Sequence, residues 1–275
     1  KLSRAERDGK LPKILVVVHL AGTSREMKTI RNLTKHYGIK IIEDASHAIG
    51  GKYDNKPVGN CTYSDISIFS FHPVKIITTG EGGMATTKNE EYAYKMRLLR
   101  SHGIEKNKNK FIGTGKEAWR YEQQFLGMNY RMTDIHAALG ISQVGRLDKI
   151  IEERNKIHKL YSQEIQDRKL PLKLLNIPKN VDSALHLCII QLLDLGKEVH
   201  EQLFMHLRKN DIGVQIHYSP IHLQPYYKQL GFKEGDFPNS ELYEKRCLSI
   251  PIFPGLKSSE QSKVLELLEV FLKKQ

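Results

Sequence analysis

Residues 14–19, ILVVVH, and residues 39–44, IKIIED, decide the fold of this chain. Both stretches are rich in β-branched residues, the pattern of strands that are buried on both faces of a parallel sheet. Between them, Thr23 and Glu26 have the spacing of a capping box at the start of a helix, and Gly38 stands where a helix would end. A strand, a helix and a second strand in this order predict a βαβ unit, and therefore an α/β fold with a mostly parallel sheet.

The α/β pattern continues along the chain and changes in texture near residue 147. We therefore predict a large domain over residues 1–147 and a smaller α/β domain over residues 148–275. In the first, we expect strands at 65–71 and 84–87, helices at 90–102 and 133–144, with Ile141 on the inner face of the latter, and a mobile loop at 104–125. In the second, we expect strands at 184–192 and 212–216, and helices at 147–168, 197–209, 238–246 and from 258 onward.

The composition is that of an ordinary folded protein, because 40% of its 275 residues are apolar and 27% are charged. Its longest apolar run is far shorter than the about 20 residues that cross a bilayer, so we predict no membrane span. The three cysteines, Cys61, Cys188 and Cys247, form no Cys-x-x-Cys pair, which argues against a disulfide framework and against a metal site. Reduced thiols predict a cytoplasmic location.

The net charge of +12 admits three interpretations: a nucleic-acid binder, a site for an anionic small molecule, or a solvated lysine-rich surface. The basic residues are densest at Lys106, Lys108, Lys110, Lys116 and Arg120, but most are spread along the chain. This spread disfavours nucleic-acid binding and leaves the other two interpretations open.

The residues that follow the predicted strands are the candidates for chemistry, because a parallel sheet binds ligands at the carboxyl ends of its strands. Asp44 ends a strand and is either the N-cap of a following helix or a carboxylate that faces a cleft. His47 is either a packed histidine or a second polar group of the same site. Lys75, which follows Pro73, is either a surface lysine or an amine made nucleophilic because desolvation lowers its pKa.

Four blocks in order carry a resemblance to a known family: EDASHAIGG at 43–51, SIFSFHPVK at 67–75, TGEGGM at 79–84 and GMNYRMTD at 127–134. They resemble the signature blocks of the pyridoxal-phosphate (PLP) sugar aminotransferases, the DegT-type family. The resemblance extends from Val16 to the C-terminal helix. It implies the aspartate-aminotransferase-like fold, PLP fold type I, in which residues 1–147 would be the remaining part of the PLP-binding domain.

The resemblance also implies roles for individual residues. Lys75 would bind PLP covalently and move a proton between the amino donor and the cofactor. Asp44 would keep the ring nitrogen protonated, and His47 would pack against the ring or its hydroxyl. Ser70 would donate to the phosphate, and Asn129 would reach the phosphate from a neighbouring subunit. The last role implies a homodimer with shared active sites.

Residues 213–227 and GDFP at 235–238 look closest to the branch of the family that acts in pseudaminic acid biosynthesis. That branch implies transfer of an amino group from L-glutamate to C4 of a UDP-linked 4-keto-6-deoxy-N-acetylhexosamine. His217, Tyr218 and His222 would then bond sugar hydroxyls, the alternative being a packed loop. The basic loop described above would close over the diphosphate.

Three alternatives remain at this point. The first is an aminotransferase for another nucleotide-linked keto sugar. The second is a PLP-dependent deoxygenase or dehydratase, in which histidine replaces the lysine; Lys75 argues against it. The third is a catalytically impaired homologue, because the resemblance implies a longer family member whose first segment holds a glycine-threonine phosphate loop and an aromatic group stacked on the ring. On that expectation, the chain is N-terminally truncated.

Overall fold

The structure, a computed structural model, describes residues 1–115, 117–193 and 196–274. Lys116, one of the basic residues named above, lies outside these ranges. Within them, no helix combines the length and the apolar character that crossing a membrane requires.

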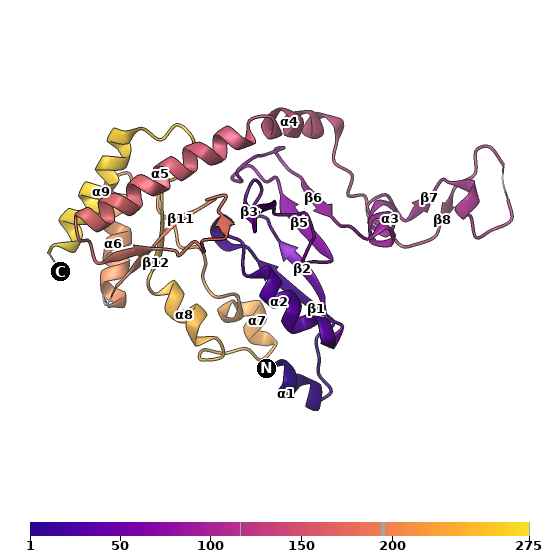
Figure 1. The fold of residues 1–275 in the computed structure, drawn as a ribbon, viewed down its shortest axis with the longest axis horizontal. Coiled ribbons are helices and arrows are strands. Elements are labelled where there is room, and N and C mark those ends of the chain that lie inside the picture. Colours follow the sequence, from indigo (N-terminus) through magenta and orange to yellow (C-terminus); the bar gives the residue numbers. More distant parts are fainter. Residues whose placement is uncertain (116, 194–195, 275) are drawn as a thin grey trace. The chain divides into compact units, whose positions relative to one another are not determined.

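The chain divides into two compact units, each of which is described by itself. Unit 1 comprises residues 1–20 and 24–147, and unit 2 comprises residues 21–23 and 148–275. In Figure 1, unit 1 runs from indigo to magenta along the sequence. The functions that the sequence analysis assigns to the two predicted domains stay predictions.

The sheet of unit 1 has the strand order β1-β2-β5-β6 (Figure 1). Its strands are β1 (Ile14–Val18), β2 (Lys40–Asp44), β5 (Ile66–Ser70) and β6 (Gly83–Thr86). The first three are parallel and β6 is antiparallel to β5. The helix α2 (Met27–Thr34) connects β1 to β2, and Gly38, with φ of 68°, ends the short 3-10 turn that follows it. The βαβ unit and the mostly parallel α/β sheet are therefore confirmed. The expected burial of β1 on both faces is wrong, because Ile14, Val16 and Val18 on one face are each at least 50% exposed.

The predicted capping box before α2 is wrong. The helix begins at Met27, and the residue before it, Glu26, makes no capping hydrogen bond. The Thr23 hydroxyl instead bonds the Ser183 hydroxyl at 2.9 Å, and Glu26 accepts a bond from the Tyr53 hydroxyl at 3.2 Å. Both side chains thus form hydrogen bonds with residues that are distant in the sequence, and the spacing of Thr23 and Glu26 could not reveal these partners.

Unit 1 has further elements outside this sheet. They are α1 (Leu2–Arg7), β3 (Lys52–Tyr53), β4 (Lys56–Pro57), α3 (Glu90–Leu99), β7 (Ile104–Glu105), β8 (Glu122–Gln123) and α4 (Asp134–Val144). Among them, the β7–β8 hairpin extends away from the sheet (Figure 1). The segment expected to be a mobile loop contains a hairpin, since β7 pairs antiparallel with β8 and Glu122 accepts bonds from the backbone of Ile112 and Gly113. Thr133 caps α4 as predicted, but Ile141 is 76% exposed, so its expected inner position is wrong.

Unit 2 is built on an antiparallel sheet of order β12-β11-β9, covered by long helices. Its elements are α5 (Leu147–Asp167), β9 (Leu172–Leu174), β10 (Val181–Asp182), β11 (Cys188–Leu192), α6 (Lys197–Lys209), α7 (Pro225–Gln229), α8 (Pro238–Glu244), β12 (Cys247–Ile250) and α9 (Ser258–Leu272). Tyr161, Ile190, Leu203, Leu248 and Leu265 form the centre of its core. The strand predicted at 212–216 is reduced to one bridge between Gln215 and Ser249.

The three cysteines are free and buried. Burial raises the pKa of the Cys188 thiol, and raises that of Cys247 to about 11, so both thiols stay protonated at neutral pH. Buried, protonated thiols are inert and serve as small apolar side chains of the core.

Candidate active site

The candidate site lies where two parallel strands of unit 1 end. Asp44 is the last residue of β2 and Ser70 is the last residue of β5. The register pairs Asp44 with Ile68, so the two strands end at the same edge of the sheet. A tight turn follows β5, in which the Lys75 backbone N–H donates to the His72 carbonyl at 2.9 Å. Parallel strands thus bring together polar residues that are far apart in the sequence.

Asp44 is held by the turn that follows β2. Its Oδ1 accepts bonds from the backbone N–H of Ser46 at 3.1 Å and from the Ser46 hydroxyl at 2.6 Å. Residues 45–51 form turns and no helix begins there, so the interpretation of Asp44 as a helix N-cap is wrong. The carboxylate is partly buried at the sheet edge, where it can act on a group outside its own turn.

The Lys75 amine is the group on which Asp44 acts. Desolvation lowers the pKa of Lys75, and the nearby Asp44 carboxylate raises it in part. The Asp44 carboxylate therefore acts on the charge of the Lys75 amine, and the catalytic roles of both residues stay predictions. An amine with a lowered pKa has a larger neutral, nucleophilic fraction at neutral pH than an exposed lysine has.

Replacing Asp44 by asparagine should lower the pKa of Lys75 further. The carboxylate favours the charged ammonium, so its removal leaves desolvation unopposed and increases the neutral fraction of the amine at a fixed pH. Labelling with a limiting amount of acetic anhydride over a range of pH, followed by mass spectrometry of the Lys75 peptide, measures this pKa. Glu81→Gln is the matched control, since the Glu81 carboxylate lies 3.9 Å from His72 and does not shift Lys75. An unchanged pKa of Lys75 in Asp44→Asn would show that the two groups do not interact.

The other predicted residues of unit 1 have different surroundings. His47 is buried, with 8% of its surface exposed, in the turn after Asp44. The Ser70 hydroxyl accepts a long bond of 3.4 Å from the His72 backbone N–H. Asn129 is exposed and forms a bridge with Ser101. Within the described part of the chain, no hydrogen bond or ion pair joins Asn129 to Asp44, Ser70 or Lys75, and its role in a neighbouring subunit stays a prediction.

The glycine-rich turn between β5 and β6 is required by packing. A Cβ atom on Gly83 would lie 2.8 Å from the Phe69 carbonyl oxygen, and one on Gly82 would lie 2.5 Å from the Thr79 hydroxyl. Gly82 also has φ of 154°, and its carbonyl accepts a bond from the Phe71 backbone at 2.9 Å. These glycines let β6 fold back tightly beside the end of β5, next to Ser70.

The three predicted sugar contacts belong to unit 2. His217 Nδ1 lies 2.7 Å from the Ser249 hydroxyl, and Tyr218 is 50% exposed. His222 is buried, and its Nε2 lies 2.8 Å from Glu241 Oε1. The hydrogen bond between His222 and Glu241 favours the packed-loop alternative for His222, whereas Tyr218 has the exposure that a ligand contact requires. Contact with a sugar stays a prediction for all three.

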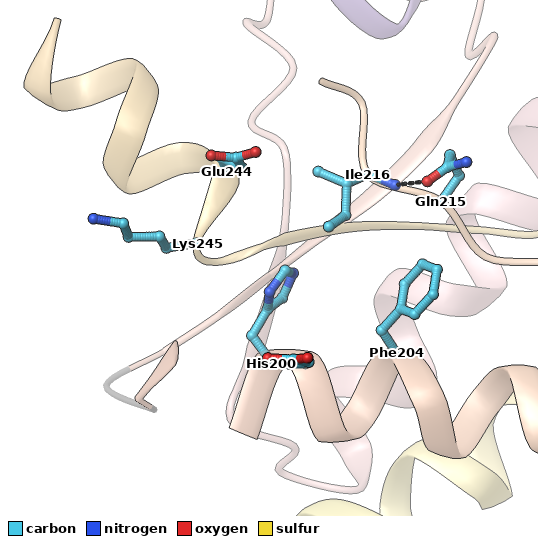
Figure 2. Close-up of a pocket in the computed structure, with 7 residues that line it drawn as sticks. His200, Phe204, Gln215, Ile216, Glu244 and Lys245 are labelled. Atoms are coloured by element: carbon cyan, nitrogen blue, oxygen red, sulfur yellow. Dashed lines mark hydrogen bonds between the residues drawn. The ribbon is translucent and has the colours of Figure 1, made fainter. Parts of the chain in front are cut away.

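Unit 2 also contains a pocket of about 290 Å³ that includes none of the predicted residues (Figure 2). Its lining consists of His200, Glu201, Phe204, Gln215, Ile216, Glu244 and Lys245. Figure 2 shows the His200 and Phe204 side chains rising from α6 toward the segment that carries Gln215 and Ile216. His200 Nε2 is already bonded to the Cys247 carbonyl at 2.8 Å. Among the residues described, no group of three or more His, Cys, Asp or Glu side chains is arranged to hold a metal ion.

One buried cluster near the site was not predicted from the sequence. His19, Glu43 and Ser64 are each at most 6% exposed, and Glu43 bonds both of the others. The available signal was Glu43 itself, a charged residue directly after the apolar pair Ile41 and Ile42 in a predicted strand. A buried charge that has no local partner indicates a partner elsewhere in the fold.

Comparison with known proteins shows what this chain is similar to. The model of the DegT/DnrJ/EryC1/StrS aminotransferase family matches residues 6–269. The UDP-4-amino-4,6-dideoxy-N-acetyl-beta-L-altrosamine transaminase of Campylobacter jejuni is 40% identical over 258 residues, which are 94% of this chain and 65% of the transaminase.

Two solved structures share the fold. The Helicobacter pylori aminotransferase PseC, involved in the biosynthesis of pseudoaminic acid, has a TM-score of 0.87 at 28% identity over 97% of this chain and 68% of PseC. The PLP form of the putative sugar aminotransferase Spr1654 from Streptococcus pneumoniae has a TM-score of 0.82 at 27% identity over 95% of this chain and 69% of Spr1654. These matches confirm the predicted fold class.

The chain spans 65% of the length of the Campylobacter transaminase. The four blocks recognised in the sequence, with Asp44 and Lys75, all lie within residues 6–269, which the family model matches. The chain therefore belongs to the DegT/DnrJ/EryC1/StrS aminotransferase family.

Proposed function

We propose that this protein is a PLP-dependent aminotransferase for a nucleotide-linked keto sugar, with L-glutamate as the amino donor. The observation that carries the proposal is a partly desolvated Lys75 amine that feels the charge of the Asp44 carboxylate at the carboxyl edge of the sheet. Lysine at this position also argues against the deoxygenase or dehydratase alternative.

The residues present fit the cofactor. When bound, PLP supplies an aldehyde for an amine and a ring that accepts electrons from the reacting carbon. Lys75 would hold the aldehyde, since its lowered pKa provides a neutral amine, and the same amine would then take and return a proton. Asp44 would keep the ring nitrogen protonated through a charge-assisted hydrogen bond. His47 would pack at the ring, Ser70 would bond the phosphate, and Asn129 of a second copy would complete the phosphate site.

The proposed substrate is a UDP-linked 4-keto-6-deoxy-N-acetylhexosamine that receives the amino group at C4. The support is the 40% identity to a transaminase named for a UDP-linked 4-amino-4,6-dideoxy sugar and the fold shared with PseC. Tyr218, with His217 beside it at a ring distance of 4.7 Å, would contact the sugar, and His222 would orient the loop. Lys106, Lys108 and Arg120 would pair with the diphosphate.

A second candidate is amination of another nucleotide-linked keto sugar, and its support is the resemblance to the putative sugar aminotransferase Spr1654. A homodimer with shared active sites and a cytoplasmic location are part of the same proposal. A catalytically impaired homologue is the remaining alternative, and it would bind PLP weakly or not at all.

The test is titration of the purified protein with PLP, followed by borohydride reduction and mass spectrometry. The proposal requires one cofactor per chain on the Lys75 peptide, and release of that cofactor in its aminated form when L-glutamate is added before reduction. Adding UDP-linked 4-keto-6-deoxy-N-acetylhexosamine and a second keto sugar to the aminated form distinguishes the two substrates. Absence of PLP from Lys75 would contradict the cofactor assignment and leave the impaired homologue.

A further inference from the structure

A buried hydrogen-bonded cluster lies on the face of the unit 1 sheet opposite the Asp44 side chain. Side chains alternate between the two faces of a strand, so Glu43 points away from the face to which its neighbour Asp44 points. Glu43 Oε2 lies 2.8 Å from His19 Nε2, and Glu43 Oε1 accepts a bond from the Ser64 hydroxyl. His19 is completely buried, and Glu43 and Ser64 are 6% and 5% exposed. We call these three residues the Glu43 cluster.

The hydrogen bonds of His19 define which ring nitrogen carries the proton. The Arg25 backbone N–H donates to His19 Nδ1 at 3.4 Å, so Nδ1 is the unprotonated nitrogen. The other nitrogen, Nε2, therefore carries the proton and donates it to Glu43. His19 thus connects the loop after β1 to the carboxylate of β2 in a single orientation.

The cluster is joined directly to Asp44 through the backbone. The His19 N–H donates to the Asp44 carbonyl at 3.0 Å, one residue beyond the register pair of Val18 and Asp44. Ser64 lies just before β5, the strand on the other side of β2. Glu43 therefore connects β1, β2 and β5 immediately beside the residue that faces Lys75. The Asp44 carboxylate is also held by Ser46 in the turn that follows β2, so the Glu43 cluster fixes the backbone of Asp44 while Ser46 fixes its side chain.

We propose that Glu43 and His19 are positioning residues, which hold the carboxyl end of β2 so that Asp44 presents its carboxylate to the Lys75 amine. Loss of the Glu43 carboxylate leaves the buried His19 N–H and the Ser64 hydroxyl without their acceptor. Relaxation of those groups moves the His19 backbone, which bonds Asp44. The role of Asp44 in binding a cofactor rests on the proposed function, whereas the position of Asp44 relative to Lys75 does not depend on it.

The experiment measures the pKa of Lys75 in variants of Glu43, by the same pH-dependent acetylation, with no cofactor present. Glu43 itself does not shift Lys75, so an effect of Glu43→Leu reaches the amine through Asp44. We expect Glu43→Leu to lower the pKa of Lys75 by at least half of the decrease produced by Asp44→Asn. Glu43→Gln is the matched control: its oxygen accepts from His19 and its amide donates to Ser64, so the pKa should equal that of the wild type.

A folded Glu43→Leu protein that melts at a lower temperature but has the wild-type Lys75 pKa would overturn the proposal, because the cluster would then only stabilise the fold. Ser64→Ala removes only the hydrogen bond from Ser64 to Glu43, and it provides the test if Glu43→Leu does not fold. We expect it to shift the pKa of Lys75 in the same direction by a smaller amount, and a folded Ser64→Ala protein with no shift would also overturn the proposal.

PLP titration of the wild type separates this proposal from the proposed function. If the wild type binds no PLP and the Lys75 pKa still falls in Glu43→Leu, the aminotransferase proposal fails and the positioning role stands. If PLP binds to Lys75 in the wild type and Glu43→Leu leaves the Lys75 pKa unchanged, the positioning role fails and the aminotransferase proposal stands.

Discussion

Replacement of Lys75 by alanine should abolish covalent attachment of PLP and, with it, the visible absorbance of the lysine-bound cofactor. The reason is that Lys75 combines an amine of lowered pKa with a neighbouring carboxylate, which an ordinary exposed lysine lacks. Transfer of the amino group from L-glutamate should fall by roughly 10²–10⁴-fold, the range for losing a positioned acid–base group. Absorbance during PLP titration and single-turnover measurements with L-glutamate report the two effects separately.

The matched control is Lys28→Ala, because Lys28 is exposed on α2 in the same unit and alanine is a good helix former. Lys28→Ala should keep both the absorbance and the rate of amino transfer. A Lys75→Ala protein that retains the absorbance and full turnover would show that another amine holds the cofactor and that the site is wrongly assigned.

Replacement of Arg154 by methionine should destabilise unit 2 by about 3 kcal/mol or more. Arg154 is 6% exposed, and its Nη1 donates to three carbonyls: those of Leu185 at 3.0 Å, His186 at 3.2 Å and Ile252 at 3.0 Å. Methionine fills most of the volume but leaves these buried acceptors without a donor, and each such loss costs about 1–3 kcal/mol. Burial lowers the pKa of Arg154 only to about 10, so the guanidinium is still charged at neutral pH. The three carbonyls replace the water that this buried charge would otherwise bind.

Chemical unfolding followed by far-ultraviolet circular dichroism measures the global effect of Arg154→Met. Amide hydrogen exchange at residues 185–187 measures the local effect, which should appear as faster exchange. Lys149→Met is the control, since Lys149 is exposed on the same helix, α5. Equal stabilities for the two variants would show that the carbonyl bonds of Arg154 contribute nothing that water cannot replace.

The sequence predicted best where the physical signal is local. The strands β1 and β2 and the helix stop at Gly38 follow from neighbouring residues, and the structure confirms them. Burial of both faces of β1 depends on the rest of the fold, and that expectation is wrong. Prediction failed where distant residues compete for the same groups. Thr23 bonds Ser183 instead of capping α2, and residues 104–125 contain a hairpin because backbone pairing between β7 and β8 outweighs their polar composition. Ile141 has the spacing of an inner position, yet it is 76% exposed.

The candidate site also has features that the sequence predicted and features that only the structure revealed. Four ordered blocks were enough to name the family, the lysine and the carboxylate, because these groups must occur at those positions for the chemistry that the family performs. The desolvation of Lys75, the bonds that hold Asp44 to Ser46, and the cluster of His19, Glu43 and Ser64 were visible only in three dimensions.

The order of residues by itself therefore determined the α/β class and the family, and it predicted which groups would react. Tertiary structure alone decided which of these groups are buried, which atoms they bond and how Asp44 acts on Lys75. The physical reason is that burial and hydrogen bonding depend on distances between residues remote in the chain, and the strength of a charge interaction changes steeply with its distance and its exposure to water.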